Sequence, residues 1–241
     1  MTKSPVFVSS YGRLELSKKE TSSLQHALAR RMTPLQRAGL ELIENWRISH
    51  ARSFDLVFKE WRAPLYFASV YGELSAYLKE AELINENSLP VSPVAFQHSV
   101  QNCTPGYFSI LHGIHTAHLT FSSGTLSLDK ALLFAWHKIS RRSKQCVCIL
   151  SANETGAPFR AVQCHAEMLI LYGGTPHVDL PATHILENFE ISRVANCDRK
   201  NQEHESIYPE LAADIFAGKQ KRSVTSRTGE CYTSIWRPLS Q

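Results

Sequence analysis

The sequence predicts an α/β layered fold with a mostly buried sheet. Apolar segments of strand length alternate with segments whose apolar residues recur at helical spacing, which is typical of a sheet covered by helices. The 241 residues are 43% hydrophobic and 20% charged, a balance that excludes a disordered chain. Since we find no internal repeat, low-complexity tract or interdomain linker, we expect residues 1–241 to form a single domain.

Spacing and capping signals locate the elements of the first hundred residues. A strand is predicted over residues 6–9, and a helix over residues 33–46, with Thr33 as its N-cap and a proline directly after it. The apolar run 65–70 predicts a buried strand, and residues 73–85 a second amphipathic helix. A proline at position 93 should keep the following segment extended at its start.

The rest of the chain continues the alternation. A helix over residues 102–111 should end at the C-cap Gly113, and a strand over 117–122 should run through a Ser-Ser-Gly-Thr bend into a strong helix over 126–139. The next apolar run, 146–150, predicts a buried strand followed by a polar turn over 151–156. Further strands are predicted over residues 165–172, 189–195 and 231–236, and a further helix over 208–217.

Charge and cysteine usage exclude several classes of protein. The net charge of +4 is too mild to indicate a nucleic-acid-binding protein. No long uncharged apolar run is present, so we expect no membrane span, and the N-terminus has too few apolar residues in succession for a signal peptide. The six cysteines have no disulfide-framework spacing, which favours reduced thiols and a cytoplasmic protein.

The segment from residue 117 to 139 has the layout of a nucleophile elbow. A strand ends in a tight bend of small residues and a helix begins at once, which would lift one side chain onto the positive end of a helix dipole. A cysteine at the bend would have a lowered pKa and attack thioesters. The bend instead holds Gly124 and Thr125, and an unactivated hydroxyl is a poor nucleophile.

This region resembles the N-terminal half of a β-ketoacyl synthase of the thiolase fold. Asn102, Gly106 and Gly113 match the family's helix under the active-site strand, and Thr125 falls at or within one residue of the catalytic cysteine. The short ketosynthase-like proteins of aryl polyene and dialkylresorcinol pathways are the most similar group. The segments that carry this likeness are residues 30–35 (RRMTPL), 67–74 (FASVYGEL), 92–113 and 152–154 (ANE).

The resemblance implies a catalytically inactive chain length factor. Such a chain lacks the family's cysteine and the C-terminal half that supplies two active-site histidines, so it could not perform decarboxylative condensation alone. It would form a heterodimer with a β-ketoacyl-ACP synthase and shape the tunnel in which an acyl chain on acyl carrier protein grows. The resemblance implies no metal or soluble cofactor, and aryl polyene (type II fatty-acid or polyketide-like) biosynthesis as the pathway.

The same resemblance assigns residues to the partner interface and to the tunnel. The strand that should pair with its counterpart in the partner comprises Ala117, His118, Leu119, Thr120, Phe121 and Ser122. The tunnel should be lined chiefly by one face of the helix over 73–85, with weaker candidates elsewhere. These lining candidates are Leu74, Tyr77, Leu78, Phe96, Phe108 and Thr125. A Leu/Tyr stripe at helical spacing also fits a plain core helix.

Other patterns leave two alternatives open. The first is an acyltransferase or thioesterase that uses Cys103 or Cys164 with a histidine, although a buried structural thiol is the commoner case. The second is a stand-alone scaffold that binds acyl carrier protein, through basic runs at 141–144 and 219–222. The string His112-x-x-His115-x-x-His118 is not expected to hold a metal, because neither a helix nor a strand brings all three to one side.

Overall fold

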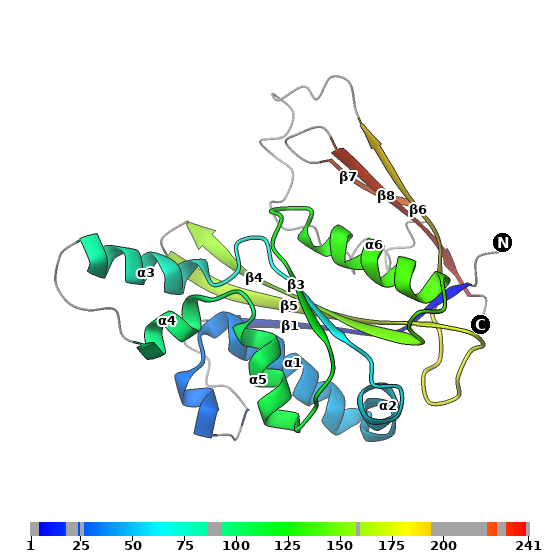
Figure 1. The fold of residues 1–241 in the computed structure, drawn as a ribbon, viewed down its shortest axis with the longest axis horizontal. Coiled ribbons are helices and arrows are strands. Elements are labelled where there is room, and N and C mark those ends of the chain that lie inside the picture. Colours follow the sequence, from blue (N-terminus) through cyan, green and yellow to red (C-terminus); the bar gives the residue numbers. More distant parts are fainter. Residues whose placement is uncertain are drawn as a thin grey trace.

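The computed structural model describes residues 5–17, 24, 27–85, 93–157, 160–193, 221–225 and 230–239. Eight strands within these ranges form one mixed sheet in the order β3-β2-β4-β5-β1-β6-β8-β7 (Figure 1). The strands are β1 (Val6–Ser17), β2 (Leu65–Ala68), β3 (His118–Phe121), β4 (Cys146–Ala157), β5 (Arg160–Gly173), β6 (His184–Arg193), β7 (Lys221–Thr225) and β8 (Glu230–Pro238). Strands β3, β2 and β4 are parallel and the other pairs are antiparallel.

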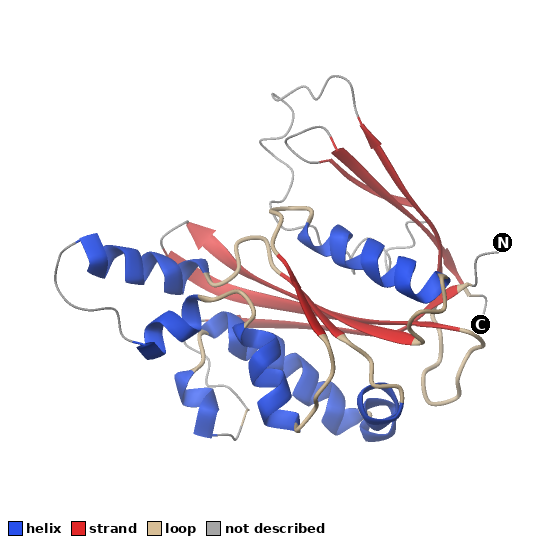
Figure 2. Cartoon of the chain, in the orientation of Figure 1, coloured by secondary structure: helices blue, strands red, loops and turns tan. Residues whose placement is uncertain are grey.

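Helices cover both faces of the sheet (Figure 2). The helices are α1 (Pro34–Ser49), α2 (Ala51–Asp55), α3 (Leu74–Asn85), α4 (Pro93–Ser99), α5 (Cys103–His112) and α6 (Ser127–Ser140), with short helical segments η1 (Ala27–Arg31) and η2 (Leu56–Glu60). Helices α1, α2 and α5 lie on one face, and α6 lies on the other. Thus the predicted α/β layered fold is confirmed.

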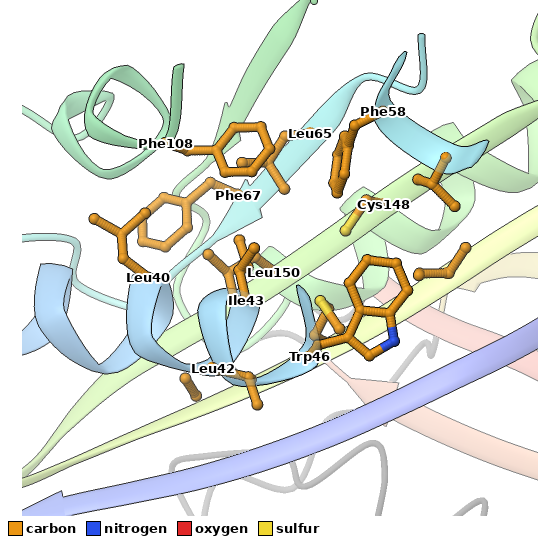
Figure 3. Packing of buried hydrophobic residues seen from close by; sticks show 14 of the residues in the cluster. Leu40, Leu42, Ile43, Trp46, Phe58, Leu65, Phe67, Phe108, Cys148 and Leu150 are labelled. Carbon is orange, nitrogen blue, oxygen red and sulfur yellow. The ribbon is translucent and has the colours of Figure 1, made fainter. Parts of the chain in front are cut away.

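One hydrophobic cluster fills the space between the sheet and α1, α5 and η2. Figure 3 shows Trp46 of α1, Phe58 and Phe108 meeting strand residues such as Phe67 and Leu150. Helix α1 begins as the sequence predicts: Thr33 is its N-cap, and a capping box with Gln36 satisfies backbone donors at both residues. Helix α5 is held in place by this cluster through Phe108.

A second hydrophobic cluster joins α6 to the C-terminal strands β6 and β8. Leu132 and Trp136 of α6 share it with Phe189 of β6 and with Tyr232 and Trp236 of β8. In Figure 1 the strands β6, β8 and β7 rise beside α6 from the edge of the main sheet. The chain therefore covers the outer side of α6 with its own C-terminal strands.

Two local predictions were wrong. Residues after position 92 form helix α4 rather than an extended segment, because Pro93 occupies the first helical position, where its missing N–H costs nothing. Residues 151–156 are not a turn: β4 continues to Ala157, opposite Arg160 of β5, so the long β4–β5 ladder absorbs the polar residues. The predicted helix over 208–217 lies outside the described residues, and β7 was not predicted.

Candidate functional site

The carboxyl ends of the three parallel strands meet at one edge of the sheet. Ala68, the last residue of β2, lies opposite both Phe121 of β3 and Ser151 of β4. The turn after β2 and the bend after β3 therefore lie together, with the polar residues of β4 beside them. Such an edge is where ligands bind in parallel sheets.

The bend after β3 has the geometry of the predicted elbow. Gly124 adopts a left-handed backbone conformation with φ of 59°, which glycine tolerates without strain. The Ser127 hydroxyl accepts a 2.8 Å hydrogen bond from the N–H of Ser123 and lies 2.7 Å from the carbonyl oxygen of Gly124. The Ser127 side chain thus connects the first turn of α6 to the bend that follows β3.

Side chains also tie the turn after β2 to this elbow. The Ser127 hydroxyl lies 2.9 Å from the carbonyl oxygen of Ser69. From the other side, the Asn153 Oδ1 atom accepts a 2.7 Å hydrogen bond from the N–H of Val70. The Ser69 Oγ atom accepts a 3.1 Å bond from the N–H of Gly72. These three buried side chains form a clamp, which we call the Ser69–Ser127–Asn153 clamp.

Thr125 is half-buried at the start of α6. Among the described residues, no hydrogen bond joins its hydroxyl to a histidine or a carboxylate that could remove the proton. A hydroxyl without such a base is not activated for attack. The elbow thus places an unactivated hydroxyl directly before Leu126, the N-cap of α6.

The cysteines of the described residues are free thiols, and four of the five are buried. Burial, and to a lesser extent the neighbouring Glu73, raises the pKa of Cys103 to about 11. Burial also raises the pKa values of Cys146 and Cys148 far above the ordinary range. Cys164 is 2% exposed. Neither candidate nucleophile, Cys103 or Cys164, is placed for reaction with an external thioester.

The three histidines of the HxxHxxH string fall on different elements. His112 ends α5, His115 lies in the connection, and His118 begins β3 with its Nε2 atom 2.6 Å from the Ser109 hydroxyl. Burial lowers the pKa values of His112 and His118, which favours their neutral forms. No group of three or more metal-ligating side chains occurs among the residues that the structure describes.

A second polar cluster, which the sequence did not reveal, lies beneath the start of α3. The carboxylate of Glu73 is 2% exposed and accepts a 2.7 Å hydrogen bond from the hydroxyl of Thr33. Thr104 donates a longer bond of 3.5 Å. Burial raises the pKa of Glu73 to about 7, although these donors oppose the shift.

The predicted tunnel residues are not all in similar environments. Tyr77 is 59% exposed on α3 and Phe96 is 61% exposed on α4, while Leu74 and Leu78 are half-buried. Phe108 is fully buried, packed against Phe58 and His112 in the core. The α3–α4 side thus presents an apolar surface to solvent, and Phe108 is not part of it.

The predicted interface strand lies at the edge of the sheet. Strand β3 pairs on one side with β2 and is the last strand in the order of the described sheet. His118, Thr120 and Phe121 are half-buried, whereas Ala117, Leu119 and Ser122 are exposed. Leu119 is exposed, as are Ile110 on α5 and Phe134 on α6, and the Phe134 ring contacts Phe121 of β3. An unpaired strand edge with apolar neighbours is a surface suited to another chain.

The motif residues around α5 play local structural roles. Asn102 precedes the helix without a side-chain capping bond, and Gly113 ends it in the left-handed conformation with φ of 62°. A Cβ atom at Gly106 would meet nothing within 4 Å. Close packing therefore does not require glycine at position 106 in this chain.

Sequence reasoning missed Asn153, Ser127 and Glu73. Ser127 begins α6, and Asn153 lies in β4 two residues beyond its parallel pairing with β2, a placement at the carboxyl ends of parallel strands that could have marked both. For Glu73 the signal was a carboxylate directly between an apolar strand and an amphipathic helix. Its partners at positions 33 and 104 lie too far away in the chain for spacing to reveal.

Comparisons with known proteins give a family and a set of similar folds. The model of the family described as "Beta-ketoacyl synthase, N-terminal domain" matches residues 10–204. No curated protein sequence matches the chain. The matched range includes all the described helices, strands β2 to β6 and the elbow, whereas β7 and β8 lie outside it.

Several solved structures share the fold over nearly the whole chain. One is the ketosynthase ApeO in complex with its chain length factor ApeC from Xenorhabdus doucetiae, with 15% identity, a TM-score of 0.66, and coverage of 96% of this chain and 98% of that chain. Another is the ishigamide ketosynthase/chain length factor, with 9% identity, a TM-score of 0.71 and coverage of 98% and 100%.

A third similar structure contains a carrier protein. The complex AntDE:AntF, a type II PKS acyl-carrier protein with its ketosynthase bound to the hexaketide, matches with 12% identity, a TM-score of 0.72 and coverage of 99% and 100%. At these identities the likeness establishes the fold. No described helix is long and apolar enough to cross a membrane.

Proposed function

Since the chain belongs to the β-ketoacyl synthase N-terminal domain family, we propose that it is a catalytically inactive chain length factor. It forms a heterodimer with a β-ketoacyl-ACP synthase and shapes the tunnel for the growing acyl chain. The observation that carries the proposal is the elbow: its geometry is complete, yet it holds Thr125 without a base. A chain that keeps the shape of a catalytic elbow but not its nucleophile is suited to a structural role.

The edge of β3 supports a strand-mediated interface with the synthase. Leu119 is 42% exposed on this strand, and Ile110 of α5 and Phe134 of α6 are 63% and 48% exposed. A partner strand would satisfy the free backbone groups of β3 and cover these three side chains. The proposed interface residues remain Ala117, His118, Leu119, Thr120, Phe121 and Ser122.

The exposed apolar side of α3 supports the tunnel assignment. Tyr77 would form the wall with Leu74 and Leu78 once the synthase covers them, because a large side chain there would stop the chain sterically. Phe96 on α4 and Thr125 at the elbow are further lining candidates. We leave Phe108 out of the wall because it lies in the core.

The pathway and location are also part of the proposal. The segments at 30–35, 67–74 and 152–154 support aryl polyene biosynthesis on acyl carrier protein. In one of the structures with a similar fold, the chain length factor ApeC is in complex with the ketosynthase ApeO. Five free cysteines among the described residues support a reducing cytoplasm.

The cysteine-dependent acyltransferase is not favoured by any contact that we observe. The raised pKa and 7% exposure of Cys103 argue against a reactive thiolate. A stand-alone scaffold would have to bind acyl carrier protein on its own surface, in the absence of the synthase. The exposed basic residues Arg141, Arg142 and Lys144 after α6 are the candidate surface for that role.

Co-expression with the ketosynthase encoded nearest to this gene tests the proposal. We expect a stable one-to-one complex by light scattering, in which condensation requires the synthase's own cysteine. A monomer or homodimer of this chain beside an unbound synthase would contradict the heterodimer. Labelling of Cys103 or Cys164 by an acyl thioester probe, abolished by Cys→Ala, would instead support the enzyme alternative.

A further inference from the structure

Helix α3 packs against α4, and Glu73, directly before its first residue, ties its start to the interior of the molecule. The carbonyl oxygen of Glu73 accepts the first helical bond, a 2.9 Å hydrogen bond from the N–H of Tyr77, so Glu73 is the residue at which the helix begins. Its side chain turns inward and is 2% exposed. The outer part of the helix is solvent-facing: Tyr77 and Ile84 are 59% and 58% exposed.

The Glu73 carboxylate joins the starts of three helices. Thr33, the N-cap of α1, donates to its Oε2 atom at 2.7 Å, and Thr104, in the first turn of α5, donates to its Oε1 atom at 3.5 Å. Helix N-termini carry partial positive charge, so one negative group serves α1, α5 and its own α3.

The same cluster reaches α4. The Gln36 Nε2 atom lies 3.4 Å from the carbonyl oxygen of His98, and its Oε1 atom accepts a 3.1 Å bond from the N–H of Thr33. Three ionisable groups interact electrostatically with the Glu73 carboxylate: Glu154 of β4, and Cys103 and Tyr107 of α5. The carboxylate thus sits where α1, α3, α4 and α5 converge.

We propose that Glu73 is a positioning residue for the tunnel wall: by tying the first turn of α3 to the starts of α1 and α5, it fixes where Tyr77 and Leu78 stand. The inference rests on the proposed function for its effect on products, but not for its effect on α3 itself. A buried carboxylate at this point costs solvation energy. We attribute its presence to the need to fix the start of a helix whose Tyr77 and Ile84 side chains face solvent.

The first test measures α3 directly in the free chain. Glu73→Gln keeps the side-chain size but replaces one acceptor oxygen by an NH2 group. This group cannot accept a hydrogen bond from the hydroxyl of Thr33 or Thr104. Glu82→Gln, on the exposed side of the same helix, is the matched control. We expect hydrogen exchange of the α3 amides to become about tenfold faster in the first variant only. Unchanged exchange in α3, or equal acceleration across β4 and β5, would overturn the proposal.

The second test follows products in the complex with the ketosynthase. Glu73→Gln should broaden or shift the product-length distribution at unchanged heterodimer yield, whereas Glu82→Gln should not. Faster exchange in α3 with unaltered products would keep the anchor but remove α3 from the tunnel wall. Absence of any complex with the unaltered chain would contradict the proposed function, while hydrogen exchange still decides the anchor.

If Glu73→Gln does not fold, hydrogen exchange cannot be measured in that variant. In that case Thr104→Val replaces it, because it removes one donor to the carboxylate and nearly preserves volume. We expect a smaller acceleration of exchange, confined again to α3. Exchange in α3 equal to that of the unaltered chain would then count against the anchor.

Discussion

The side-chain oxygen of Asn153 on β4 accepts a 2.7 Å hydrogen bond from the backbone N–H of Val70, directly after β2. Both residues are 7% exposed, so water does not replace this bond freely. The bond closes the Ser69–Ser127–Asn153 clamp from the side of β4. It makes the position of the turn before α3 depend on a residue more than eighty positions later.

Asn153→Ala should destabilise the chain by about 1–3 kcal/mol, because the buried N–H of Val70 loses its acceptor. Urea unfolding of the free chain measures the change. Asn85→Ala, at the exposed end of α3, is the control and should stay within about 0.5 kcal/mol of the unaltered chain. Equal stability of the two variants would contradict the clamp.

Thr125→Cys should create a thiol with a lowered pKa, because residue 125 directly precedes Leu126, the N-cap of α6, where the helix dipole favours a thiolate. The rate of iodoacetamide labelling as a function of pH measures its pKa. Ser122→Cys, exposed at the end of β3, is the comparison and should titrate at higher pH. Coinciding profiles would mean that the elbow does not influence residue 125.

Tyr77→Ala should lengthen the products made by the heterodimer without lowering its yield, since it removes a bulky group from the proposed wall. Product masses from the reconstituted complex provide the measurement. Ile48→Ala, an equally exposed position on α1, is the control. If product length does not change, α3 is not the wall.

Stability should depend on pH through Glu73. Its pKa is raised from 4.5 to about 7 in the fold, so ionisation is less favourable in the folded than in the unfolded chain. The unaltered chain is therefore most stable, with respect to this group, below pH 4.5, and loses about 3 kcal/mol as the pH rises to about 7.

Glu73→Gln removes this titration. The difference in unfolding free energy between Glu73→Gln and the unaltered chain should shift in favour of the variant between pH 4.5 and 7 and then level off. Denaturant unfolding at several pH values measures it, with Glu82→Gln as the control. A difference that shifts the other way would show that the three helix N-termini outweigh burial.

Trp236→Ala should cost about 3–5 kcal/mol, since this side chain is 1% exposed and lies in the cluster that covers α6. Arg237→Ala removes only an exposed ion pair with Glu187 and should cost at most about 1 kcal/mol. Denaturant unfolding compares the two. Similar losses would mean that β8 contributes little to covering α6.

The sequence predicts much of this fold because local signals coincide with the elements. The N-cap at Thr33, the C-cap at Gly113 and the bend at Gly124 each mark a boundary that the structure confirms. The β4 extension was not predictable, since residues 151–156 have turn composition and become strand only by pairing with β5. Tertiary pairing overrides local preference there.

The site was predictable in outline but not in its contacts. The elbow at residues 123–125 follows from the order of strand, bend and helix. The clamp and the Glu73 cluster depend on residues brought together from separate elements, such as Thr33 and Glu73. Spacing along the chain carries no information on such pairs, and neither does it distinguish the exposed Tyr77 from the buried Phe108.

The place of β1 in the sheet bears on how the molecule folds. Val6 pairs with Gly173 on one side and Leu186 on the other, so the middle of the sheet joins segments very distant in the chain. The parallel strands that carry the elbow come from a much shorter stretch, residues 65–151. Because contacts between distant segments form slowly, we expect β1 to pair late in folding, after the elbow has assembled.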